Sequence, residues 1–152
     1  MAQTESALYT VGVFADAAWA ERGIDALKKR GFAAEQLTLA GKASPELTAL
    51  VERATGGAPE TLDLPGVGPA LARGPLMDTL NGSARDLPRV GLAAAMRRAG
   101  FQPHDGLIFE RLVGKGGVLV AVQTAPRAAD ALAVMLSYGG GNAAIGAWGP
   151  RV

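Results

Sequence analysis

The chain has 152 residues, of which 49% are apolar, and its 15 lysine and arginine residues nearly balance 14 aspartate and glutamate residues. This length fits one domain with a sizeable core, and the formal charge of +1 creates no overall field for nucleic acid or anionic lipid. The absence of cysteine excludes disulfides, thiolate metal ligands and a cysteine nucleophile. Because neither a signal peptide nor an apolar run of about 20 residues is recognisable, we expect a cytoplasmic protein with no membrane partner.

The first 41 residues predict a β-α-β unit. Residues 9–14 (YTVGVF) have the β-branched and aromatic composition of a strand. Asp16 is a suitable N-cap for the amphipathic helix that follows, and Gly31 is a suitable stop for it. A short alternating strand is then expected at residues 36–40.

Residues 117–152 repeat this plan. A strand is predicted at 117–124, a helix with Pro126 in its first turn follows, and a closing strand is expected at 143–148. Two such units commonly interleave as an antiparallel sheet with both helices on one face. We therefore predict a single α+β domain over the whole chain, a ferredoxin-like split β-α-β sandwich that is interrupted by a central insertion at residues 42–116.

The insertion is predicted to be mainly helical, because it is too long for a structureless loop. Helices are expected from Ser44-Pro45 to about Ala54, at residues 86–99 and at residues 103–113. In the last of these, Leu107, Ile108 and Leu112 are spaced to pack against the core. Residues 56–65 resemble a turn-rich break, and residues 69–76 are expected to be extended because a Gly-Pro pair interrupts any helix there.

The strand at residues 117–124 has two apolar faces, because Val118 and Val120 alternate with Leu119 and alanine. One face of a two-layer domain meets water, so an apolar second face implies a cover, either the insertion or a second subunit. The leading hypothesis is therefore a non-enzymatic domain that acts by self-association or partner binding. We expect a homodimer whose interface includes Val118, Val120 and Trp148.

Catalytic groupings are not recognisable in the sequence. His104 is the sole histidine and stands at an expected helix N-terminus, where a solvated side chain is the simplest interpretation. Acidic pairs such as Asp105 and Glu110 fit the surface of a helix. No paired carboxylates or Ser-His-Asp pattern is present, so we expect no catalytic residue, no metal and no cofactor.

Glycine-rich turns support a second hypothesis, a regulatory domain that binds a small molecule or an anion in the cleft between sheet and insertion. Backbone N–H groups of turns can form an anion-binding nest without basic side chains. The candidate residues are Gly66, Gly68, Gly116 and Gly117. A P-loop is excluded, because the segment 114–117 (GKGG) has neither the glycine spacing nor the hydroxyl residue of that motif.

Residues 64–72 (LPGVGPALA) resemble the hairpin of helix-hairpin-helix DNA-binding modules, which bind phosphate through backbone N–H groups. The nearby cations are Arg73 and, further on, Arg85, and so few phosphate contacts give weak binding to duplex. A basic cluster of Arg89, Arg97 and Arg98 fits a solvated helix face. Nucleic acid is therefore the least favoured partner.

Three segments together resemble one known family. They are VGVFADAAWAERGIDALKKRGFAAEQLTLAG at 11–41, PGVGPALARGPLMDTL at 65–80 and GFQPHDGLIFERLVGKGGVLVAV at 100–122. In this order, and over most of the chain, they are similar to the bacterial general stress protein, or heat-induced stress protein, domain. The resemblance implies a stress-associated bacterial protein with no catalytic residues to carry over, and it accounts for the P-G-V-G-P run as a structural element of the family.

Overall fold

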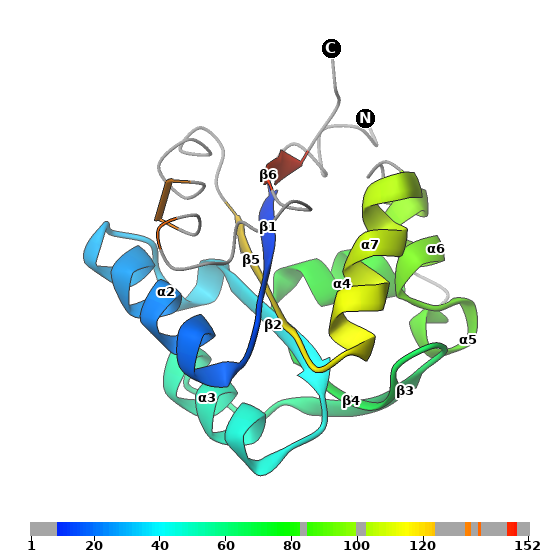
Figure 1. Cartoon of the computed structure of the whole chain (residues 1–152), viewed down its shortest axis with the longest axis horizontal. Coiled ribbons are helices and arrows are strands. Elements are labelled where there is room, and N and C mark those ends of the chain that lie inside the picture. Colours follow the sequence, from blue (N-terminus) through cyan, green and yellow to red (C-terminus); the bar gives the residue numbers. More distant parts are fainter. Residues whose placement is uncertain are drawn as a thin grey trace.

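The computed structural model describes residues 9–82, 85–99, 103–123, 133–134, 137 and 146–148, which are arranged around one antiparallel sheet (Figure 1). Its strands are β1 (Tyr9–Phe14), β2 (Leu37–Lys42), β3 (Glu60–Leu64), β4 (Gly68–Arg73), β5 (Val118–Gln123) and β6 (Gly146–Trp148). They follow one another across the sheet in the order β3-β4-β2-β5-β1-β6. Strands of the two predicted halves thus alternate at the centre of the sheet, and the predicted α+β class is confirmed.

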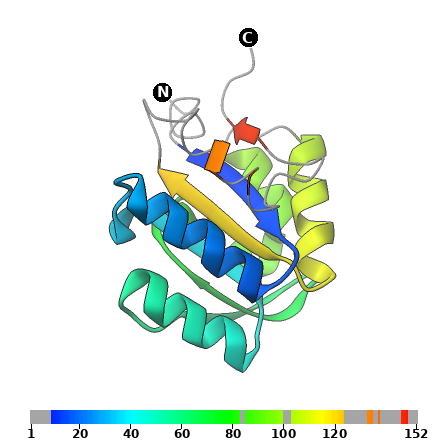
Figure 2. The same ribbon diagram turned by 60° about the vertical axis from the view of Figure 1, so that its left-hand side comes forward.

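Helices cover both faces of the sheet, which makes three layers (Figure 1, Figure 2). They are α2 (Ala17–Lys29), α3 (Pro45–Thr55), α4 (Pro75–Asn81), α5 (Leu87–Val90), α6 (Leu92–Arg98) and α7 (Pro103–Gly114), with a 3-10 turn, η1, at Ala34–Gln36. Helices α2 and α3 lie side by side on one face, and α4 to α7 lie on the other. No helix of the described residues is both long and apolar enough to cross a membrane.

The first two helices begin where the sequence predicts. Asp16 caps α2, because its Oδ1 accepts a hydrogen bond from the backbone N–H of Trp19 at 2.9 Å. Ser44 caps α3 in the same way, and its Oγ accepts from Leu47 N at 3.0 Å. Side-chain acceptors at these positions satisfy N–H groups that the first turn of a helix leaves unpaired. Both caps are confirmed.

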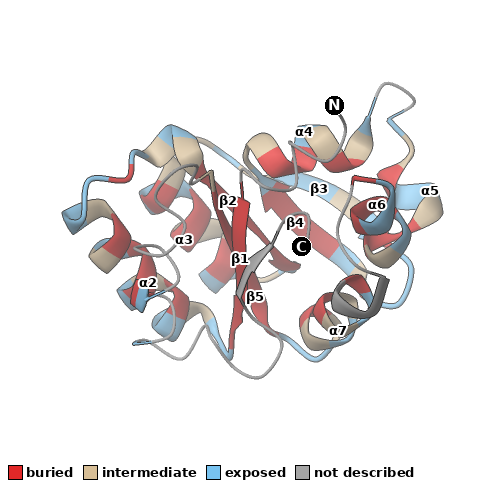
Figure 3. Ribbon diagram, turned by 90° about the horizontal axis from the view of Figure 1, so that it is seen from above, coloured by how far each residue is buried: buried red, intermediate tan, exposed pale blue. Residues whose placement is uncertain are grey.

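Strand β5 shows why the sheet needs two covers. Its Val118, Val120 and Val122 side chains belong to the core cluster that also contains residues of α2 and α3. Leu119 and Ala121 belong to the second cluster, under α4, α6 and α7. The strand is buried from Val118 to Val122, and only its last residue, Gln123, is half-buried (Figure 3). Helices therefore cover both faces of β5, as the sequence implied. The face that carries Leu119 and Ala121 is covered by α4, α6 and α7, which belong to the insertion.

This arrangement corrects the predicted dimer interface. The side chains of Val118 and Val120 are only 4% and 0% exposed within the single chain, so they are not a surface on which a second subunit could pack. The prediction was wrong because α3 and α7 both come from the insertion and reach opposite faces of the sheet. Trp148 lies in β6 and pairs with Tyr9 in the strand register, and its side chain lies outside the described residues.

The insertion departs from prediction in three places. Residues 60–64 form β3, although the segment 56–65 was expected to be a turn-rich break. The expected extended segment at 69–76 is a strand to Arg73, after which α4 begins at Pro75. The helix expected at 86–99 is divided at Gly91, whose φ of 91° is outside the helical region and ends α5.

Two predicted elements fall largely outside the described residues. The helix after Pro126 is described only in part, and Val134 within it is helical and buried in the cluster that contains α2. Residues 143–145 of the closing strand are not described, and residues 146–148 form β6.

Candidate functional site

The segment that resembled a DNA-binding hairpin is a β-hairpin. Its turn follows β3, where Val67 N donates to Leu64 O at 3.0 Å and Gly66 has a φ of 81°. Proline at the second turn position and glycine at the third are typical of a type II turn. Because the turn joins two strands instead of two helices, the helix-hairpin-helix interpretation was wrong.

The turn after α7 does not offer the predicted anion nest. Gly116 N donates to Val113 O at 3.0 Å, and Gly117 N donates to Leu112 O at 3.0 Å. These bonds close the C-terminus of α7, as in a Schellman motif. The two N–H groups are therefore already paired within the chain, and this half of the predicted anion site was wrong.

The other half of the predicted anion site packs against a carboxylate. A Cβ at Gly66 would lie 2.8 Å from Oε2 of Glu110, and a Cβ at Gly114 would lie 2.7 Å from Gly66 O. Gly68 pairs with Leu64 in the ladder between β3 and β4. The glycines thus let the hairpin turn and the end of α7 approach closely, and the Glu110 carboxylate there disfavours an anion.

Two of the three arginines in the predicted basic cluster form salt bridges to one aspartate. Asp86 accepts hydrogen bonds from Nη2 of Arg98 at 2.7 Å and from Nη2 of Arg89 at 3.0 Å. Arg98 also donates to Leu80 O at 2.7 Å, which ties α6 to the end of α4. The hydrogen bond from Arg98 is the main reason that the pKa of Asp86 lies below its ordinary value. Arg97 differs, because it is exposed and has no salt bridge to any described residue.

A hollow of about 290 Å³ lies on the face formed by α6 and α7. It is lined by Val90, Ala93, Ala94, Arg97, Leu107 and Glu110, which we call the α6–α7 face. The two helices approach closely because α7 carries Gly106, where a Cβ would lie 3.0 Å from Ala93 O. The lining of the hollow is therefore mostly small or apolar, and it includes one arginine and one glutamate.

Leu107 projects from this face instead of packing inward as predicted. Its side chain is 57% exposed, whereas Phe109 and Val113 are fully buried on the opposite side of α7. Ile108 and Leu112 pack partly against the core, as expected. The helical spacing fits either set of apolar residues, and contact with the sheet selects the set that contains Phe109.

Glu110 has a role that the sequence did not indicate. Its Oε1 accepts a hydrogen bond from the backbone N–H of Ala93 at 3.2 Å, so it serves the N-terminus of α6 from a neighbouring helix. Gly91, which precedes α6, has no side chain to do this. The side chain is half-buried, in contrast to the surface position expected for it.

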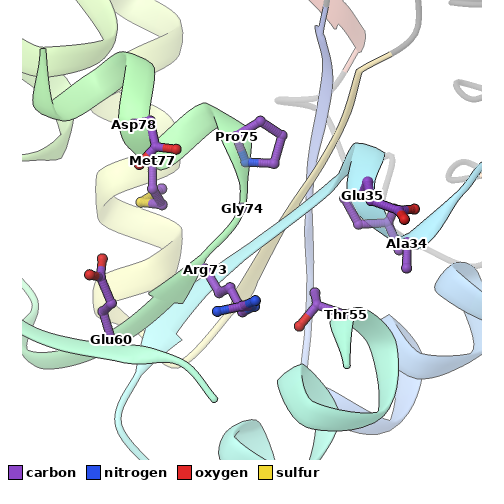
Figure 4. A pocket seen from close by; sticks show the side chains of 10 residues that line it. Ala34, Glu35, Thr55, Glu60, Arg73, Gly74, Pro75, Met77 and Asp78 are labelled. Atoms are coloured by element: carbon purple, nitrogen blue, oxygen red, sulfur yellow. The ribbon is translucent and has the colours of Figure 1, made fainter. Parts of the chain in front are cut away.

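A second, open groove of about 390 Å³ lies at the ends of β3 and β4 (Figure 4). Arg73 lies at its centre, with Glu35, Glu60 and Asp78 around it. Nη1 of Arg73 donates to Ala58 O at 3.2 Å, and none of the described carboxylates forms a salt bridge with this arginine. Such a groove can accept a molecule that carries both an ammonium and a carboxylate group.

Metal-ligating side chains do not gather into a cluster within the described residues. No group of three or more histidine, cysteine, aspartate or glutamate residues in that part of the chain could hold a metal ion. His104 lies in the first turn of α7, and the structure describes only its backbone. The chain matches no protein-family model, no curated protein and no solved structure.

Proposed function

We propose that this chain is a non-enzymatic, stress-associated domain that acts by self-association. The observation that carries the proposal is Leu107, a large aliphatic side chain that is 57% exposed beside an apolar hollow. An exposed apolar side chain next to a hollow of matching character is typical of a surface that becomes buried in an assembly. The proposal thus keeps the expected homodimer, but its interface is now on α6 and α7 and not on the sheet.

The other exposed large hydrophobic side chain of the described residues is a weaker candidate. Trp19 is 44% exposed, and the guanidinium carbon of Arg22 lies 4.9 Å from the centre of its ring. A cation–π contact of this kind already covers part of the ring. Leu107 is the more exposed of the two, at 57%, and it lines a mainly apolar hollow.

The remaining parts of the proposal rest on topology and motifs. The order β2-β5-β1-β6 is the order of a ferredoxin-like sheet, which supports a ferredoxin-like core to which the hairpin of β3 and β4 is added. The three sequence segments that resemble the general stress protein family support a bacterial, stress-associated role. Composition supports a cytoplasmic location and a non-enzymatic domain.

Light scattering on the whole chain tests self-association. We expect the mass to rise from one copy of 15.5 kDa towards two copies across a series from micromolar to millimolar protein. A mass of one copy at every concentration would contradict the proposal.

A small zwitterion in the Arg73 groove is the second candidate function. It is favoured by the guanidinium of Arg73, which stands among three carboxylates without a salt bridge to any described residue. Free amino acids, tested by thermal shift, should stabilise the wild type and not Arg73→Met, which keeps most of the apolar stem. Arg111→Met is the matched control on an exposed arginine outside the groove. Equal shifts in all three proteins would exclude the groove.

A further inference from the structure

We infer that the α6–α7 face binds the same face of a second copy of this chain around a two-fold axis. Leu107 of each copy enters the hollow of the other, and Arg97 of each copy faces Glu110 of the partner subunit. The inference rests on the proposed self-association and specifies the surface and the pairing that produce it.

The shape of the face meets the requirement of a two-fold interface. Such an interface uses one patch on both copies, so the patch must be complementary to itself. The α6–α7 face carries an exposed side chain, Leu107, and a hollow of about 290 Å³ whose lining includes Ala93 and Ala94. A leucine side chain fits within that volume. A surface with only the projection or only the hollow would need a different partner.

The charges of the face meet the same requirement. Arg97 lines the hollow from α6, and Glu110 lines it from α7. Arg97 has no salt bridge to a described residue, although Arg89 and Arg98 both bind Asp86. A two-fold axis through this face places Arg97 of one copy opposite Glu110 of the other, twice per dimer. Complementary charges of this kind fix orientation and exclude other partners.

Glu110 can accept an additional partner. One of its oxygens accepts from Ala93 N, and the other lies against the Gly66 backbone. An ionised carboxylate provides about four acceptor sites, so the bond to Ala93 leaves capacity for a guanidinium. The N-terminus of α6 and the arginine of the partner subunit would both stabilise its negative charge.

Charge exchange provides the first test. Arg97→Glu alone and Glu110→Arg alone each place like charges together twice per dimer, so we expect self-association to weaken at least about tenfold in each. An equimolar mixture restores both opposite-charge pairs and should form a heterodimer, measured by light scattering and by native mass spectrometry. If both single variants dimerise as tightly as the wild type and their mixture shows no preference for the heterodimer, the inference is overturned.

Glu110→Arg also removes the cap of α6, so a second test avoids that residue. Because the chain has no cysteine, each introduced cysteine is the sole thiol of its variant. A mixture of Leu107→Cys and Ala94→Cys proteins should give a disulfide-linked heterodimer under mild oxidation. Trp19→Cys mixed with Ala94→Cys is the matched control and should give none.

The two proposals fail differently. A wild-type protein that stays monomeric overturns both self-association and the proposed pairing. A wild-type dimer that is insensitive to the charge variants and gives no Leu107–Ala94 disulfide overturns the pairing alone, and self-association then uses another surface.

Discussion

The helices on the two faces of the sheet obtain their N-terminal caps in different ways. On one face, α2 and α3 are capped by the residues immediately before them, Asp16 and Ser44. On the other face, α4 and α6 follow Gly74 and Gly91, which have no side chains. Their capping groups come from distant parts of the chain.

Each remote cap joins a helix to another element of the fold. Thr38 Oγ1, on β2, accepts from Leu76 N of α4 at 3.0 Å. Glu110 Oε1, on α7, accepts from Ala93 N of α6 at 3.2 Å. Short helices are marginal in isolation, so α4 and α6 depend on these tertiary contacts to begin where they do. The starts of α2 and α3 therefore depend on residues next to them in the sequence, whereas the starts of α4 and α6 depend on contacts made in the folded chain.

The largest expected effect comes from Gly74, where α4 leaves β4. Its φ is 135°, and a Cβ there would overlap Leu37 O, Thr38 Cα and Thr38 Oγ1. Gly74→Ala therefore adds a backbone clash to a strained conformation and also displaces the remote cap. We expect a loss of about 3 kcal/mol or more in the free energy of unfolding, measured with urea.

Gly56→Ala is the matched control for this prediction. Gly56 ends α3 with a φ of 81°, and nothing lies within 4 Å of a Cβ there. The substitution carries conformational strain without a clash, so its expected cost is about 1 kcal/mol. If both variants lose the same free energy of unfolding, the clash at Gly74 contributes nothing, and its positive φ alone accounts for the need for glycine.

The second expected effect tests the remote cap directly. Thr38 is fully buried, and Thr38→Val replaces its hydroxyl with a methyl group of similar size. The N–H of buried Leu76 then loses its acceptor, and we expect a loss of about 2 kcal/mol. Thr38→Ser keeps the hydroxyl and removes only a methyl group, so it should cost less. The opposite order, measured by urea unfolding, would show that the packing of the methyl group matters more than the cap.

The difference between the two layers also explains which parts of the fold could be predicted. Strand β1, the start of α2 at Asp16 and the start of α3 at Ser44 depend on neighbouring residues, and all three were predicted. Strand β3 was missed, because it is a short edge strand with polar Glu60 and Asp63 and depends on pairing with β4. The break at Gly91 was missed because the apolar spacing continues through it.

The candidate site was harder to predict, because its residues are assembled by the packing of helices. Two apolar faces on β5 correctly implied a cover, but the sequence could not say that the insertion supplies it. Leu107 and Phe109 are both apolar, and contact with the sheet decides which of them is exposed. Glu110 resembles any surface glutamate until α6 is placed beside it.

A smaller effect is expected from the local caps. Ser44→Ala removes the acceptor for Leu47 N at a partly buried helix start, and a change of this type costs about 1 kcal/mol. Ser44→Asp keeps an acceptor and should retain most of the stability. Urea unfolding should therefore rank Ser44→Ala below Thr38→Val in cost. The reverse ranking would contradict the distinction between locally and remotely capped layers.

The smallest expected effect concerns Asp86, which joins α5 to α6 and is predicted to make stability depend on pH. Its pKa is lowered in the folded chain, mainly by the hydrogen bond from Arg98. The stabilisation is therefore complete above the ordinary aspartate pKa of about 3.9 and is lost as the pH falls through the lower folded value.

Asp86→Asn should be less stable than the wild type at neutral pH, and this difference should shrink as the pH falls below that range. A double-mutant cycle with Arg98→Met isolates the pair, because the other contacts of Arg98, to Leu80 O and Asn81 O, cancel in the cycle. The coupling between Asp86 and Arg98, obtained from urea unfolding, should be present at neutral pH and vanish in acid. A coupling that does not change with pH would mean that the contact stabilises the helical layer without its charge, because protonation would then leave it intact.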